Sequence, residues 1–183
     1  MAASVEHTVL PAPDFDAPVK VLIVVSPYYS DIAAGLLGGA KAALEGVGAT
    51  YEVVEMPGAL EIPTAIGISD RASNFDGYVA LGCVIRGETT HYETVCNDSS
   101  RALQLLGLQG LCIGNGILTV ENKAQADVRA DPEGQNKGGG AALAALHLIA
   151  LARKWSSNPT GIGFKPRGED TLMAGDLDGN PTA

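Results

Sequence analysis

Short apolar runs alternate along the chain with stretches in which apolar residues have helical spacing. The continuous β-branched run at 21–25 is typical of a strand that is buried on both faces of a sheet. Three further apolar runs of strand length follow at 51–56, 78–85 and 111–118, the last of which is interrupted by two glycines. The pattern therefore predicts four strands.

Helical periodicity follows each of these runs. Apolar residues recur three to four positions apart over 32–44, where Ser30 or Asp31 can cap the start and Gly46 or Gly48 can end the helix. The same reasoning predicts four more helices: one that opens at 59–63, one that follows residue 91 and runs through 106, a short one over 122–129, and an alanine-rich one over 139–154.

The alternation of strands and helices predicts an α/β fold, a four-stranded parallel sheet with helices on both faces. A sheet of four strands is narrow, so its edges and outer helix faces are available to a partner subunit. Residues 1–19 lack periodicity and are predicted to form an N-terminal arm that is loose or docked on a neighbour. Residues 20–155 are predicted to form one domain, and 156–183 a flexible C-terminal tail.

The composition agrees with one globular domain. The 183 residues are 46% hydrophobic and 18% charged, which suffices for a core without metal or disulfide support. A net charge of −9 with only 12 Lys and Arg argues against nucleic acid as a partner. No apolar run approaches the roughly 20 residues that span a bilayer, and no signal peptide is recognisable, so we expect a cytoplasmic protein that does not bind membranes.

Several common kinds of site find no support in the sequence. Cys83, Cys96 and Cys112 show no CxxC spacing and are expected to be buried, reduced thiols. No cluster of His, Asp or Glu has metal-ligand spacing, and no phosphate-loop or dinucleotide signature follows a strand. Ser99 and Ser100 lack the context of a nucleophile elbow. We therefore expect neither a metal nor a redox cofactor.

Candidate chemistry follows three of the predicted strands. Tyr28 and Tyr29 come after the first strand in a chain with few aromatics, and 57–61 after the second combines a turn with the carboxylate of Glu61. The segment 86–91 follows the third strand. Because ligands of parallel sheets bind beyond the carboxyl ends of the strands, we expect these segments to meet around one ligand.

The third segment has the most specific composition. Gly87 permits close approach of a ligand, and Glu88, Thr89 and Thr90 lie at a predicted helix start, where free N–H groups favour an anion. His91 follows, and a histidine side chain ordinarily titrates at about pH 6.5, suitable for moving protons. The alternative is that Thr89 is only a helix cap and His91 only a surface residue, and the spacing alone does not decide.

Two of the few cations flank a loop between the last two helices. Arg129 and Lys137 border 130–136, and an arginine at such a loop is suited to phosphate recognition. The alternative is that both are solvated residues at helix ends. His7 in the arm and His147 within an Ala/Leu helix are interpreted as surface or packing residues.

Four segments resemble the 6,7-dimethyl-8-ribityllumazine synthase family, in that family's order: 57–63, 81–92, 116–122 and 136–138. The stretch Val-Ile-Arg-Gly-Glu-Thr-Thr-His within the second segment is highly specific. The resemblance covers about residues 20–154 and implies a three-layer flavodoxin-like sandwich. It also implies a transferase of riboflavin biosynthesis. Such an enzyme condenses 5-amino-6-(D-ribitylamino)uracil with 3,4-dihydroxy-2-butanone 4-phosphate and releases phosphate and water, without metal or redox cofactor.

The resemblance also implies roles for individual residues. Tyr28 would stack on the pyrimidine and His91 would donate and accept protons. The ribityl chain would be held by Ala59, Leu60 and Glu61, and the pyrimidine pocket would be lined by the backbone of Cys83, Val84 and Ile85. Glu88 and Thr89 would bind the phosphate. Asn115 and Arg129 would reach the site from a neighbouring subunit, where Arg129 pairs with the phosphate and Lys137 lies nearby.

The chain departs from the family at three of these positions. Leu60 and Asn115 replace bulkier aromatic residues, so stacking should be thinner, and Tyr28 adds a hydroxyl where phenylalanine is usual. The family resemblance implies pentamers with active sites between subunits, and possible association with riboflavin synthase. The loop from 129 to 137 has no insertion relative to shell-forming members, which favours a 60-subunit icosahedral shell over a free pentamer. The rival hypothesis is a non-catalytic binder of flavin-like ligands or a structural cage.

Overall fold

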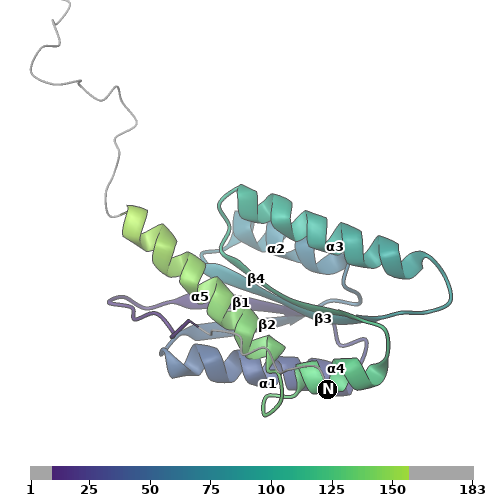
Figure 1. The fold of residues 1–183 in the computed structure, drawn as a ribbon. Coiled ribbons are helices and arrows are strands. Elements are labelled where there is room, and N and C mark those ends of the chain that lie inside the picture. Colours follow the sequence, from purple (N-terminus) through teal and green to yellow (C-terminus); the bar gives the residue numbers. More distant parts are fainter. Residues whose placement is uncertain (1–9, 157–183) are drawn as a thin grey trace, which may run out of the picture.

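The structure is a computed structural model that describes residues 10–156. Strands and helices alternate through most of this range, and two helices close it (Figure 1). In chain order the elements are β1 (Lys20–Val25), α1 (Ser30–Gly46), β2 (Thr50–Glu55), α2 (Glu61–Ala72), β3 (Gly77–Ile85), α3 (His91–Leu108), β4 (Ile113–Val120), α4 (Lys123–Ala130) and α5 (Lys137–Ser156).

The strands form one parallel sheet in the order β2-β1-β3-β4. Helices α1, α4 and α5 cover one face and α2 and α3 the other (Figure 1), which confirms the predicted three-layer, flavodoxin-like α/β arrangement. The chain leaves β1 for β2 along one face, whereas it reaches β3 and β4 along the other. The carboxyl ends of β1 and β3 therefore border the point at which the sheet order reverses, the usual ligand position in such sheets.

Both faces of the sheet are packed against apolar side chains. In β1, Val21, Ile23 and Val25 belong to the core under α1, α4 and α5, whereas Leu22 and Val24 belong to the core under α2 and α3. The edge strand β2 is largely exposed, because no strand within residues 10–156 pairs with its outer side. The β-branched run at 21–25 is thus buried on both faces, as its composition predicted.

Small residues bring helix α5 close to its neighbours. A Cβ added at Gly114 in β4 would lie 1.8 Å from the carbonyl oxygen of Ala141, so the strand and the helix touch through their backbones. No side chain larger than hydrogen fits in that space. The abundance of glycine and alanine in this part of the sequence follows from this close packing.

Element boundaries differ from the sequence prediction by one or two residues at several places, and three of these differences concern β4, α5 and the start of α1. Strand β4 starts at Ile113 instead of 111, because the N–H of Leu111 bonds to the carbonyl of Leu106 and completes the last turn of α3. Helix α5 starts two residues earlier than predicted, at Lys137. Neither Ser30 nor Asp31 caps α1, since its N-cap is Tyr29, whose side chain makes no capping hydrogen bond.

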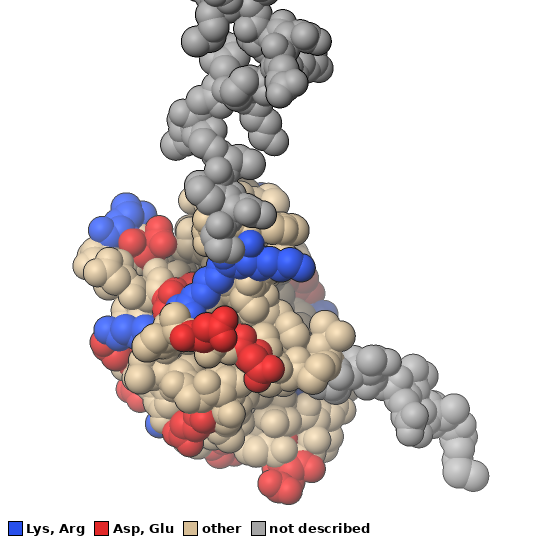
Figure 2. All heavy atoms as spheres, turned by 90° about the vertical axis from the view of Figure 1, so that its left-hand side faces the viewer, with Lys and Arg blue, Asp and Glu red and all other residues tan. Residues whose placement is uncertain are grey.

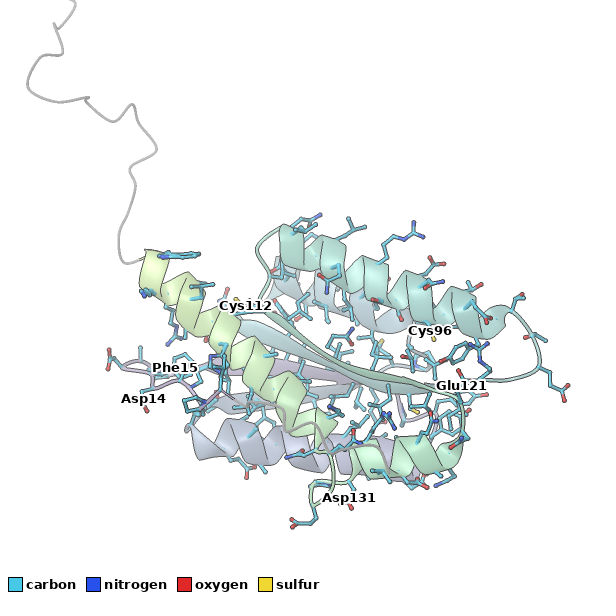
Figure 3. The ribbon with its side chains drawn as sticks, viewed as in Figure 1. Asp14, Phe15, Cys96, Cys112, Glu121 and Asp131 are labelled. Atoms are coloured by element: carbon cyan, nitrogen blue, oxygen red, sulfur yellow. The ribbon has the colours of Figure 1, made fainter. Side chains whose placement is uncertain are left out.

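The two ends of the described chain lie beside each other. Arg153 near the end of α5 donates to the carbonyl oxygens of Ala17 and Pro18 at 2.9 and 2.7 Å, and to Asp76 at 3.0 Å. Its guanidinium also lies 5.5 Å from the ring of Phe15, which Figure 3 shows beside α5. Nearly all of the predicted tail, 157–183, and the first nine residues of the predicted arm lie outside the described residues.

Basic and acidic side chains are interspersed on the face of the protein shown in Figure 2, rather than gathered into a basic surface. Several cations of the described residues pair with carboxylates, such as Lys20 with Glu52 at 2.7 Å and Lys123 with Asp31 at 2.7 Å. Within residues 10–156, no helix has the length and apolar character needed to cross a membrane.

Candidate active site

A cavity of about 420 Å³ lies at the carboxyl ends of β1 and β3, beside the turn that follows β2. Here the N–H of Ser26 donates to the carbonyl oxygen of Leu81 at 2.9 Å, which extends the β1–β3 pairing to the cavity rim. The cavity is built by the three segments that the sequence singled out. Its lining comprises Ser26, Tyr28, Tyr29, Gly58, Ala59, Leu60, Glu61, Cys83, Val84, Ile85, Gly87, Thr89, His91, Tyr92 and Val95.

Two tyrosines after β1 form one side of the cavity. Tyr28 is 74% exposed, and its ring meets that of Tyr29 edge to face, with centroids 5.0 Å apart and planes at 73°. Burial, aided by the neighbouring Tyr28 and Cys83, raises the pKa of Tyr29 above its usual value. Tyr29 thus packs against Tyr28 as an uncharged ring. The face of the Tyr28 ring remains available to a flat ligand.

The turn after β2 places a carboxylate at the start of α2. Glu61 is the first residue of this helix, and its N–H bonds to the carbonyl oxygen of Gly58 at 3.3 Å. A Cβ added at Gly58 would lie 2.8 Å from Oε2 of Glu61, so the carboxylate folds back over the glycine. Ala59 is buried and Leu60 is 37% exposed. This segment offers both backbone groups and a carboxylate to a hydroxyl-rich ligand.

The end of β3 forms the floor of the cavity. Val84 and Ile85 are half-buried, and Cys83 is buried. Burial is the main cause that raises the pKa of Cys83 to about 11, with smaller contributions from the charges of Asp127 and Asp31. The thiol is therefore protonated at neutral pH and acts as a wall of the cavity, because the nucleophilic form of cysteine is the thiolate.

The segment that follows β3 brings His91 to the cavity as the first residue of α3. Thr89 and Gly87 line the cavity beside it, whereas Glu88 is exposed and lies outside the lining. The N-cap of α3 is Thr90, and its side chain makes no capping hydrogen bond. Thr89 is therefore not the N-cap of α3, whereas His91 is exposed, as the alternative of a surface residue expects. The start of α3 borders the cavity through Thr89 and His91, and the free N–H groups of a helix start are suited to an anion.

Besides Glu88, three of the predicted site residues lie outside the lining of this cavity. Asn115 accepts a hydrogen bond from the N–H of Ile117 at 3.0 Å and lines a second cavity, of about 570 Å³, between α3 and β4. Arg129 donates to the carbonyl oxygen of Gln125 at 3.0 Å within α4. Lys137 is the exposed first residue of α5. The single chain thus brings the pyrimidine and ribityl residues together, but not these three.

Four lining residues were not singled out as ligand contacts from the sequence. Tyr92 and Val95 lie one and four positions after His91, so helical spacing from a candidate catalytic residue is a signal that could have found them. Ser26 directly follows the apolar run of β1, and its hydroxyl lies 3.5 Å from the carbonyl oxygen of Pro57. Gly58 was noted only as part of a turn, and its role in making room for a carboxylate depends on tertiary geometry.

Cysteine burial is less complete than the sequence suggested. The three cysteines are free thiols, and Cys83 and Cys112 are buried, but Cys96 is only partly buried on α3 (Figure 3). Burial raises the pKa of Cys96 as well, so this thiol also remains protonated at neutral pH.

Comparison with known proteins gives one consistent result. Residues 18–153 match the family described as 6,7-dimethyl-8-ribityllumazine synthase. The chain is 58% identical over 163 residues to the 6,7-dimethyl-8-ribityllumazine synthase of Jannaschia sp. (strain CCS1), which covers 89% of this chain and 92% of that protein. It is 55% identical over 137 residues to the protein of the same name from Novosphingobium aromaticivorans, covering 75% and 99% of the two chains. A further relative of that name, from Bartonella henselae, is 55% identical over 140 residues, covering 75% and 90%.

Proposed function

The chain belongs to the 6,7-dimethyl-8-ribityllumazine synthase family, and from this premise we propose which of its residues carry the reaction. The protein is a transferase of riboflavin biosynthesis and acts on small molecules. It condenses 5-amino-6-(D-ribitylamino)uracil with 3,4-dihydroxy-2-butanone 4-phosphate to 6,7-dimethyl-8-ribityllumazine, and phosphate and water are released.

The uracil substrate occupies the cavity at the ends of β1 and β3. Its ring stacks on Tyr28, and its polar edge meets backbone groups of Cys83, Val84 and Ile85. The ribityl chain extends along Ala59, Leu60 and Glu61, where the carboxylate accepts hydrogen bonds from its hydroxyls. The observation that carries this assignment is that all seven of these residues line one cavity of about 420 Å³.

The phosphate of the second substrate lies at the start of α3. Backbone N–H groups at Glu88 and Thr89, together with the Thr89 hydroxyl, hold it in the positive end of the helix dipole. Thr90, the N-cap of α3, makes no side-chain capping hydrogen bond. This supports the assignment, because no N-cap side chain competes with the phosphate for the N–H groups of the helix start. The anion then lies beside His91, which is also part of the cavity lining.

His91 moves the protons of the condensation. The 5-amino group of the uracil attacks the carbonyl carbon of the other substrate, and loss of water leaves an imine. Elimination of phosphate leaves an enol that tautomerises to a methyl ketone. Attack of the ribitylamino nitrogen on that ketone, with loss of a second water, closes the second ring and completes the product. Each step needs a proton added or removed, and a single well-placed group of this kind contributes about 10²–10⁴-fold to the rate. Holding both substrates together supplies much of the rest.

Arg129 completes the phosphate site of a neighbouring subunit, with Lys137 nearby, and Asn115 reaches the same site. This proposal is supported by their positions, since all three lie outside the cavity of their own chain. We infer a homo-oligomer of pentamers with active sites between adjacent subunits, preferably a 60-subunit icosahedral shell in the cytoplasm, possibly associated with riboflavin synthase. Five chains of 18.7 kDa give about 94 kDa and sixty give about 1.1 MDa, which light scattering distinguishes.

Mixing the purified protein with its two substrates tests the assignment. Lumazine absorbance and green fluorescence should appear at a rate proportional to the protein concentration. Folded, assembled protein that forms no product would instead favour a non-catalytic binder of flavin-like ligands. A scattering mass near 94 kDa would contradict the shell and leave the catalytic assignment standing.

A further inference from the structure

Arg86 holds three partners at once, although its side chain is partly exposed. Its Nη1 lies 2.5 Å from Oε1 of Glu93, and its Nε lies 2.7 Å from Oε2 of Glu121. The guanidinium also lies 4.2 Å from the centroid of the Tyr92 ring. An arginine that is bound on two edges and one face has a fixed orientation, unlike most surface cations.

The partners of Arg86 come from three separate elements. Arg86 directly follows β3, and its N–H bonds to the carbonyl oxygen of Val120 at 2.9 Å. Glu93 lies in the first turn of α3. Glu121 follows β4, and Figure 3 shows it beside the start of α3. The guanidinium therefore joins the ends of two neighbouring strands to the start of the helix that carries the candidate acid–base residue.

The segment between these anchored points is the one that faces the phosphate site. Residues 87–90 connect Arg86 to His91. The ion pair between Arg86 and Glu93 links the two sides of this connection. The pairing lowers the pKa of Glu93 and raises that of Arg86, so both groups keep their charge throughout the neutral range. The helix start and the loop are thereby held as one unit.

The same network continues to the cation that the proposed function assigns to the neighbouring site. The N–H of Glu121 donates to Oε1 of Gln125 at 3.0 Å, and Arg129 donates to the carbonyl oxygen of Gln125 at 3.0 Å. The side chain of Asn122 accepts from the N–H of Gln125 at 3.0 Å and caps α4. A continuous set of contacts thus runs from Arg86 to Arg129.

We propose that Arg86 is a positioning residue that, through Glu93 and Glu121, holds the 87–90 loop and His91 in the geometry that binds the phosphate substrate. This inference rests on the proposed function of the site. Arg86 acts through the loop and not by contact with the substrate, since two carboxylates already hold its Nη1 and Nε edges. A displacement of about 1 Å at a reacting group can cost roughly 100-fold in rate, so partial loosening should be measurable.

Three variants test the proposal against a matched control. Arg86→Gln, Glu93→Gln and Glu121→Gln each remove one member of the network and keep the approximate size of the side chain. Glu52→Gln removes an exposed ion pair with Lys20, and neither of these residues lines the 420 Å³ cavity. For each protein we would measure kcat, inhibition by inorganic phosphate, affinity for the lumazine product, and hydrogen–deuterium exchange of the amides from 87 to 93.

We expect Arg86→Gln to lower kcat about tenfold, to raise the inhibition constant of phosphate by a similar factor, and to speed exchange in that segment. Affinity for the lumazine product should stay within about twofold, because the pyrimidine pocket is built by other segments. Glu93→Gln and Glu121→Gln should change these quantities in the same direction, Arg86→Lys should restore part of the loss, and Glu52→Gln should change none of them.

The measurements distinguish failure of the positioning proposal from failure of the proposed function. If only Arg86→Gln weakens phosphate and both glutamate variants leave it unchanged or tighter, Arg86 binds the anion directly and the positioning proposal is overturned. Unchanged exchange in all three variants also overturns it. A wild-type protein without product formation refutes the proposed function instead, and the exchange measurement still decides whether Arg86 holds the loop.

Discussion

Helix α5 approaches α1 so closely at Gly138 that a Cβ added there would lie 1.9 Å from the carbonyl oxygen of Leu36. Because the obstructing atom belongs to the backbone of a buried helix, the contact cannot relax by turning a side chain. Helix α5, which begins at Lys137, can therefore keep this position only with glycine at residue 138.

Replacing Gly138 with alanine should destabilise the protein. We expect a loss of about 1–3 kcal/mol or more in the free energy of unfolding, since the helices must move apart. Gly140→Ala, two residues along the same helix, is the control. Gly140 is exposed and has no atom within 4 Å of an added Cβ, so alanine there should stabilise by up to about 1 kcal/mol. Urea denaturation at a fixed protein concentration measures both, and equal effects of the two variants would contradict the packing argument.

Gly58→Ala should impair binding of the ribityl chain with little effect on stability. The added Cβ would lie 2.8 Å from Oε2 of Glu61, and the flexible carboxylate can turn away. We expect a several-fold higher KM for the uracil substrate, comparable to that of Glu61→Gln, and an unfolding free energy within about 0.5 kcal/mol of wild type. If Gly58→Ala binds the uracil substrate normally, the position of the Glu61 carboxylate does not matter for affinity.

His91→Ala should lower kcat by about 10²–10⁴-fold, because the variant loses the group that moves protons. Both substrates should still bind, since the cavity walls and the start of α3 remain. Steady-state kinetics combined with fluorescence titration of the lumazine product separates rate from affinity. Full activity in this variant would show that His91 is not the acid–base residue.

Arg129→Ala should raise KM for the phosphate substrate about tenfold or more and leave KM for the uracil substrate nearly unchanged, because a charge-assisted contact to phosphate is lost. Arg71→Ala, which removes an exposed arginine near the end of α2, serves as the control and should alter neither constant. An unchanged KM for the phosphate substrate in Arg129→Ala would refute the assigned role.

Stability should fall at alkaline pH partly through Tyr78, which is 2% exposed and donates to Asp70 at 3.4 Å. Burial first, and then Asp70, raises the pKa of Tyr78 to about 12. An unfolded tyrosine titrates at about pH 10. Between these values the unfolded chain has lost a proton that the folded protein retains, so stability is present below pH 10 and declines as pH rises toward 12.

Tyr78→Phe isolates this effect. The variant should lose about 1 kcal/mol at neutral pH through the missing hydrogen bond, but its unfolding free energy should fall less steeply above pH 10. The unfolding free energies of the variant and the wild type, plotted against pH, should therefore converge as pH rises. Parallel curves from pH 8 to 11 would mean that Tyr78 does not titrate differently in the folded and unfolded states.

The sequence predicted the convergence of the site more reliably than the boundaries of the elements around it. Tyr28, Glu61 and His91 each follow a different strand, and parallel strands present their carboxyl ends at one edge, so the three residues line one cavity. Their roles in catalysis stay predictions. The start of β4 was misplaced because Leu111 completes a turn of α3 through a hydrogen bond to Leu106, a choice that local hydropathy does not encode.

The chain's own pattern determined the α/β class, the four strands and the segments that form the cavity, because these depend on local composition and periodicity. The tertiary structure decided which residues that lie far apart in the sequence contact one another. The bridge from Arg86 to Glu121 joins positions 35 residues apart, and the contact of Gly138 with Leu36 joins positions about a hundred apart. Such pairs depend on how strands are ordered and how closely helices pack, and no single segment carries that information.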